Sequence, residues 1–194
     1  MKPPEITIHQ ILAWRPCNMA PGEKYSRDGL RSLFGGRDSI TPLEVCDLPI
    51  SAVDRLWVLL HVEVLGEKTL RLLAADFAEH VLPFYESKYP GDLRPRKAIE
   101  AARAFARGEI DREALRKAHD AVIAATNDAD AATYAATATC SAADTYAANG
   151  TADAGAAAYA AYATYAANDA TDAERKWQIA RVRGLLDGSI PSEW

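Results

Sequence analysis

The feature that most constrains this chain is a long block that carries charge of only one sign. From Ala118 to Glu174 there is no Lys or Arg, whereas there are seven Asp and one Glu. Alanine, the residue with the highest helix propensity, fills 27 of the 60 positions from Ala114 to Ala173. Same-sign blocks are often disordered, but because alanine spaces out the charges here, we expect helix.

Outside this block the charges nearly cancel. Residues 1–117 hold 18 Lys and Arg against 17 Asp and Glu, and the net charge of the 194-residue chain is -5. Direct binding of nucleic acid is disfavoured, because phosphate binding depends on a surplus of Lys and Arg. No apolar run is long enough for a signal peptide or a membrane span. We therefore expect a cytoplasmic protein that does not bind membranes.

The residues that usually carry chemistry form no motif. Three cysteines and four histidines are scattered along the chain, without the spacing of a zinc site or a disulfide framework. There is no phosphate-binding loop, nucleophile elbow or evident carboxylate pair. The sequence therefore predicts a protein that is not an enzyme and uses no metal or cofactor. An enzyme with an unrecognised site stays as an alternative, which a bound metal or a deep polar pocket containing His61, His80 or His119 would support.

Helix start and stop signals divide the N-terminal half into short helices separated by turns. No stretch alternates polar and apolar residues with a period of two, so no sheet is predicted. The expected helices are Ile8–Trp14 after a Thr7 cap, one from Ser26 to Phe34, a short one opened by Thr41-Pro42, one after Ser51, an amphipathic one over Glu67–Tyr85 that Pro83 kinks or ends, and one with Pro95 in its first turn that runs to Gly108.

The alanine-rich region is expected to form a helical hairpin after a cap at Asp111. Small residues recur in steps of three and four along two seams, one from Leu115 to Ala147 and one from Ala152 through Trp177 to Ala180. Asn149-Gly150 separates the seams with residues suited to positive φ. Because the sequence TYAAN occurs at 145–149 and again at 164–168, a stack of short helical repeats is the alternative.

The fold class that follows is all-α. A bundle of short helices over residues 1–110 precedes an acidic, alanine-rich helical region over residues 111–194, which packs on the bundle as one continuous unit. Small residues at the seams let two helices approach closely. The same seams could instead mediate self-association into a homodimer.

The acidic and tyrosine side chains of this region are the candidate residues for binding a protein partner. One interpretation is a solvated face that keeps alanine-rich helices soluble; the other is a negative surface for a basic partner. Tyrosine is a favoured interface anchor, although these tyrosines could also fill gaps against the N-terminal helices. The candidates are Asp128, Asp130, Asp144, Asp153, Asp169, Asp172, Tyr146, Tyr162 and Tyr165.

Several segments resemble a known family. The stretch RLLAADFAEHVLPFYESKYPGDLRPRKAIEAARAFARGEI (Arg71–Ile110), with TPLEV (Thr41–Val45), DRLWVLL (Asp54–Leu60) and ERKWQIARVRGLL (Glu174–Leu186), is similar to the alanine-rich immunity proteins of bacterial polymorphic-toxin systems, which also occur in phage and prophage genomes. The tail departs from the family pattern, since it carries Tyr, Thr and Asp where the family is richer in Trp and Arg. This departure concerns the partner rather than the scaffold.

The resemblance implies a small helical protein that neutralises a toxin by binding it, with no catalytic residues to carry over. An alternative is a phage-encoded inhibitor of a bacterial defence complex, of the anti-CRISPR type. That inhibitor would use the same acidic surface to occupy a groove meant for nucleic acid. The sequence does not separate these two protein-binding functions, and it does not identify the protein bound.

Overall fold

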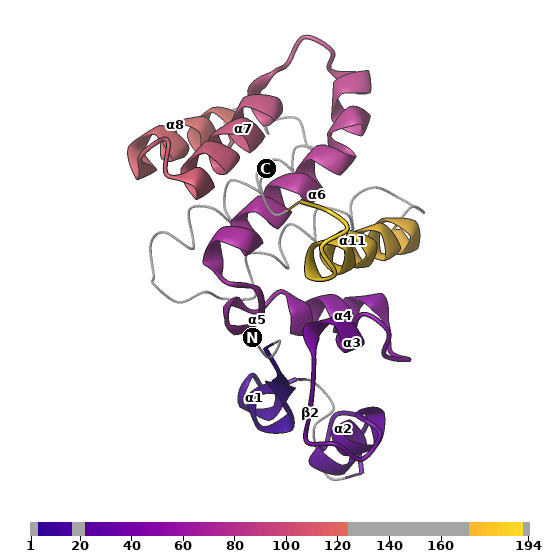
Figure 1. Cartoon of the computed structure of the whole chain (residues 1–194). Helices are drawn as coiled ribbons and strands as arrows, with labels where there is room; N and C mark the ends of the chain where they lie inside the picture. Colours follow the sequence, from indigo (N-terminus) through magenta and orange to yellow (C-terminus); the bar gives the residue numbers. More distant parts are fainter. Residues whose placement is uncertain (1–3, 17–21, 124–170, 192–194) are drawn as a thin grey trace.

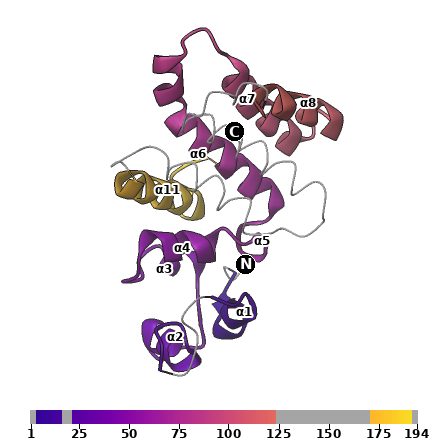
Figure 2. The same cartoon turned by 180° about the vertical axis from the view of Figure 1, so that it is seen from behind.

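A computed structural model describes residues 4–16, 22–123 and 171–191 of the chain (Figure 1). The described residues are mostly helical, which confirms the predicted all-α class. The longest of the described helices, α6 (Glu67–Lys88), runs through the middle of the molecule. Helices α7 (Arg94–Arg107) and α8 (Arg112–Ile123) lie on one side of it and α11 (Thr171–Leu186) on the other, an arrangement seen from both sides in Figures 1 and 2.

Short helices form the N-terminal part, as the sequence predicted. Four of them begin at a Ser or Thr whose side-chain oxygen accepts a hydrogen bond from a backbone N–H three residues later, which satisfies one of the free donors of a helix start. The helices are α1 (Ile8–Ala13, capped by Thr7), α2 (Arg27–Leu33, by Ser26), α3 (Pro42–Val45, by Thr41), α4 (Ala52–Leu59, by Ser51) and the uncapped α5 (Val62–Leu65).

The prediction that the chain contains no sheet is wrong in one small respect. Strands β1 (Ile6–Thr7) and β2 (Ser39–Ile40) pair antiparallel, with Ile6 opposite Ile40. Both isoleucines are buried, each with 2% of its surface exposed. Two-residue strands are too short to show the period-2 alternation by which strands are recognised in a sequence, so this pairing could not be detected there.

Helix α6 differs from its expected end. Pro83 lies inside the helix, which continues to Lys88. Proline removes one backbone donor and crowds the preceding turn, yet Pro83 is exposed and the helix resumes after it. Beyond it, the chain turns at Tyr89–Asp92, where the Asp92 N–H donates to the Tyr89 carbonyl at 3.0 Å.

Both expected boundaries of the next helix and the expected start of the one after it are also confirmed. Pro95 lies in the first turn of α7, and Gly108 ends that helix in the left-handed region at φ 77°. The Asp111 carboxylate accepts the Ala114 N–H at 2.9 Å at the start of α8. Within the described ranges, no helix combines the length and the apolar character needed to cross a membrane.

Helix α11 packs against α4 and contributes Ile179 and Val182 to the core formed by the N-terminal helices and α6. The predicted seam is wrong at this end, because Ala180 is exposed whereas Gln178 and Val182 are fully buried. Val182 gains more from burial than alanine does. Gln178 faces inward with it and donates from Nε2 to the buried Glu174 carboxylate. The first seam beyond Val122, the second seam before Thr171, the Asn149-Gly150 turn and the repeat lie outside the described residues.

Candidate functional site

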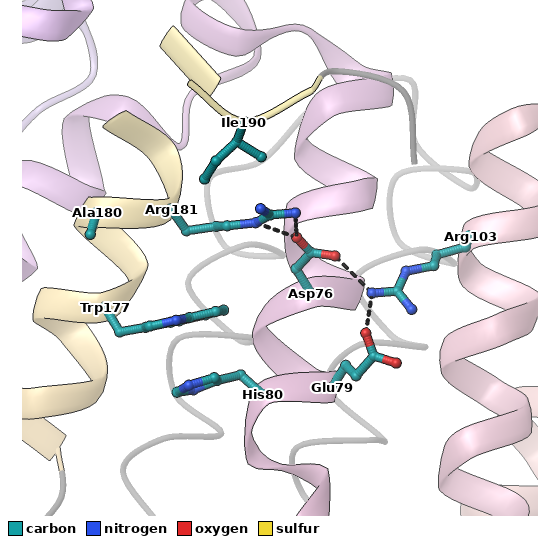
Figure 3. Close-up of a pocket in the computed structure, with 8 residues that line it drawn as sticks. All are labelled: Asp76, Glu79, His80, Arg103, Trp177, Ala180, Arg181 and Ile190. Carbon is teal, nitrogen blue, oxygen red and sulfur yellow. Dashed lines mark hydrogen bonds and ion pairs between the residues drawn. The ribbon is translucent and has the colours of Figure 1, made fainter. Parts of the chain in front are cut away.

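A groove of about 700 Å³, lined by charged and aromatic side chains, lies over α6, between α7 and α11 (Figure 3). We call it the α6 groove. Helix α6 contributes three of its side chains, α7 contributes one, and α11 with the residues after it contributes the rest. The lining residues are Asp76, Glu79, His80, Arg103, Trp177, Ala180, Arg181 and Ile190.

Asp76 connects the three helices. It is 7% exposed, and its two carboxylate oxygens accept hydrogen bonds from different arginines (Figure 3). Arg103 Nη2 donates to Oδ1 at 2.7 Å, and Arg181 Nε donates to Oδ2 at 2.6 Å. Burial raises the pKa of Asp76, and the two arginines offset this effect only in part. Asp76 thus fixes α7 and α11 on the same turn of α6.

Glu79 presents negative charge at the surface of the groove. Its Oε2 accepts the same Arg103 Nη2 at 2.6 Å, and its side chain is 46% exposed. The hydrogen bond from Arg103 lowers the pKa of Glu79, although partial burial acts in the opposite direction. The carboxylate is therefore ionised at neutral pH and accessible to a partner.

An aromatic pair forms the opposite wall. The rings of His80 and Trp177 are stacked, with centroids 3.6 Å apart and planes inclined by 9°. His80 Nδ1 lies 2.5 Å from Glu174 Oε2, and Gln178 Nε2 donates to the other oxygen of that buried carboxylate at 3.2 Å. Trp177 also meets Phe77 edge-on, at 6.1 Å between centroids. These contacts hold the wall in a defined shape.

The charged groups that line the groove are largely engaged with one another. Both oxygens of Asp76 are engaged by arginines, and the lining residues that the structure describes include no Ser, Thr or Cys that His80 could activate as a nucleophile. The enzyme alternative requires a deep polar pocket, whereas His80 lines an open groove and His61 stacks on Trp14. Among the described residues, no group of three or more His, Cys, Asp or Glu could hold a metal ion.

One of the candidate residues predicted from the sequence can be placed. Asp172 lies in the first turn of α11, where it is exposed and pairs with Lys176 at 2.9 Å. The hydrogen bond from Lys176 lowers the pKa of Asp172. The other eight, Asp128, Asp130, Asp144, Asp153, Asp169, Tyr146, Tyr162 and Tyr165, lie outside the described residues.

The α6 groove was not predicted from the sequence, although the position of Asp76 indicates a buried charge that needs a partner. Asp76 is a single acid within the apolar stretch Leu72–Ala78, whose other members are all buried. A charge at such a position requires a partner, since an unpaired buried charge is very costly. The identity of that partner was hidden, because Arg103 is 27 residues and Arg181 is 105 residues away along the chain.

Comparison with known families gives one match. The model of the family described as "Imm-5 like putative immunity protein" matches residues 60–184, which is more than half of the chain. This range contains every residue that lines the α6 groove except Ile190. Comparison with curated proteins and with solved structures gives no match.

Proposed function

The chain belongs to the Imm-5 like immunity proteins, and on that premise we propose that it binds a toxin protein stoichiometrically and blocks its activity. The family match is the observation that carries this proposal. An inhibitor of this kind needs a shaped, chemically specific surface rather than a catalytic centre. The α6 groove is such a surface, and it lies almost wholly within the matched range.

The α6 groove is the toxin-binding surface in this proposal. Tryptophan and arginine are enriched among the residues that contribute most to binding, and such residues cluster in well-packed hollows. Trp177, Arg103 and Arg181 have this setting, because each is held by contacts within the protein before any partner arrives. A surface that is already ordered loses less conformational entropy on association.

The charges of the groove favour a basic segment of the toxin. Three carboxylates, those of Asp76, Glu79 and the adjacent Glu174, stand against the two guanidinium groups of Arg103 and Arg181. Both guanidinium groups are already bonded to carboxylates, whereas Glu79 is half exposed. A lysine or arginine of the toxin would therefore meet Glu79 first, with Trp177 nearby for apolar and cation–π contact.

The acidic region predicted from the sequence is a second contact surface in the same proposal. Its side chains carry the same sign of charge as the groove and would extend attraction for a basic partner. The supporting observation remains the absence of Lys and Arg from Ala118 to Glu174. The proposed contacts are the nine Asp and Tyr candidates named above.

The test is a titration of the purified protein against the toxin encoded by the neighbouring gene. Calorimetry measures the binding, and an assay of the toxin's activity measures the inhibition. We expect a complex of one to one that abolishes toxin activity. Glu79→Lys should weaken binding at least about tenfold, because it places like charges at the centre of the contact. The matched control is Glu100→Lys, an exposed glutamate on α7 that does not line the groove.

A second arm reverses the charge of Asp128, Asp144, Asp153 and Asp169 together. If affinity and its salt dependence are unchanged by this quadruple variant, the acidic region is not part of the interface. If Glu79→Lys and Glu100→Lys bind equally well, the groove is not the contact surface. Failure to bind the toxin, combined with capture of a subunit of a phage-defence complex, would replace the immunity function with the anti-defence alternative.

A further inference from the structure

The N-terminal part of the protein contains a second cavity of different character. It has a volume of about 360 Å³ and is walled by apolar side chains of α1, α2, α4 and the connection between α3 and α4. Ile11, Leu30 and Phe34 form buried wall positions, whereas Val53 is 45% exposed. All the described residues that line it precede the segment that matches the immunity family. We call this cavity the N-terminal pocket.

Three charged side chains lie on the lining of the N-terminal pocket: Arg15, Lys24 and Asp54. The Asp54 carboxylate accepts several hydrogen bonds. Asp54 Oδ2 accepts the Tyr25 hydroxyl at 2.5 Å and the Ser51 hydroxyl at 2.7 Å, and Lys24 Nζ lies 3.6 Å from it. One cation thus balances the one anion, which leaves the charge of Arg15 in excess.

Arg15 itself is set in an unusual backbone conformation. Its φ is 57°, and among the residues that the structure describes no other non-glycine residue has a positive φ. It follows the last turn of α1, where a glycine would adopt this geometry without steric cost. No ion pair links its exposed guanidinium to another described residue. A guanidinium with no ion pair among the described residues, at the edge of an apolar cavity, suits the polar end of an amphiphilic ligand.

We propose that the N-terminal pocket binds a small amphiphilic carboxylate, such as a medium-chain fatty acid, with its carboxylate on Arg15 and its chain among the apolar walls. The volume is within the range of small-molecule sites, and the mixture of many apolar groups with few polar ones is typical of them. A guanidinium is suited to a carboxylate because it donates two parallel hydrogen bonds. This proposal is independent of toxin binding.

Calorimetry with decanoate, decan-1-ol and decylamine tests the charge preference, since the three probes share one chain length. We expect decanoate to bind one to one, at least about tenfold tighter than the other two. Arg15→Gly keeps the left-handed turn and removes the cation. It should reduce decanoate affinity to the level of decan-1-ol and leave decan-1-ol unchanged. The control for loss of a positive charge is Arg27→Gln, because glycine at this position would also weaken helix α2.

The apolar part is tested by Val53→Trp, which places a large side chain at the exposed edge of the pocket. It should weaken decanoate and decan-1-ol equally, whereas Leu93→Trp, at an exposed apolar residue outside the pocket, should weaken neither. Circular dichroism checks that both variants are folded. Absence of saturable decanoate binding, or equal affinity for decylamine, would overturn the proposal. If decanoate fails but Val53→Trp weakens the toxin complex, the pocket is a protein contact instead.

Discussion

Asp76 shows how much of the architecture can depend on one side chain. Its carboxylate is shared by an arginine of α7 and an arginine of α11, and all three charges are largely withdrawn from water, with side-chain exposures of 7%, 20% and 23%. Burial of an ion pair is not by itself stabilising, since the lost hydration offsets the attraction. The network is better understood as a device that fixes the positions of three helices.

The first prediction concerns this residue. Asp76→Ala should lower the free energy of unfolding by about 3 kcal/mol or more, because it leaves Arg181 partly buried without this carboxylate. Chemical denaturation measures the change. The control is Asp38→Ala, whose carboxylate is 73% exposed and 3.8 Å from Arg31, and which should cost less than about 0.5 kcal/mol. Equal losses in both variants would mean that Asp76 has no special role.

At the scale of the secondary-structure element, helix starts are the best-specified features. Helix α3 has a complete capping box, in which the Thr41 hydroxyl accepts the Glu44 N–H and Glu44 Oε2 accepts the Thr41 N–H at 2.7 Å. Arg37 Nη2 donates to the other oxygen of Glu44 at 2.7 Å. The Thr41 backbone and the Arg37 side chain together lower the pKa of Glu44 from its ordinary value of 4.5.

The second prediction is a dependence on pH that arises from this helix start. A carboxyl with a lower pKa in the folded state stabilises the fold fully above its unfolded pKa and loses that contribution as the pH falls through the folded value. Glu44→Gln should therefore be less stable than the parent by about 0.5 kcal/mol at pH 7. The difference should disappear well below pH 4.5. A difference that persists in strong acid would contradict an electrostatic origin.

At the scale of the whole molecule, the N-terminal helices and α11 share one core. Buried side chains from β1, α1, α4, α6 and α11 belong to a single cluster, which includes Leu59 at 0% exposure and Val182 at 0%. Elements at opposite ends of the described chain therefore stabilise each other. Because they share this core, α11 lies beside α4 in Figures 1 and 2.

The third prediction follows from the shared core. Leu59→Ala should reduce stability by about 2–5 kcal/mol, because the side chain is fully buried and leaves a cavity. If the core unfolds as one unit, hydrogen exchange of amides in both α4 and α11 should accelerate by the same factor. Exchange that accelerates in α4 alone would show that α11 is stabilised independently of the N-terminal helices.

The sequence by itself determined the helical class and most helix boundaries, because these depend on interactions between residues three or four apart. Thr7, Ser26, Thr41 and Ser51 each act as caps where the local pattern predicted them. The resemblance to immunity proteins was likewise present in the linear sequence, and the family match confirms it.

Only the tertiary structure decided which distant residues meet. The pairing of Ile6 with Ile40, the two arginines on Asp76 and the inner face of α11 all join segments that no local pattern connects. Alanine spacing predicted Ala180 on the inner face of α11, whereas the larger side chains of Gln178 and Val182 occupy it. The physical reason is that burial energy depends on the shape and size of the opposing surface, and that surface exists only after the chain has folded.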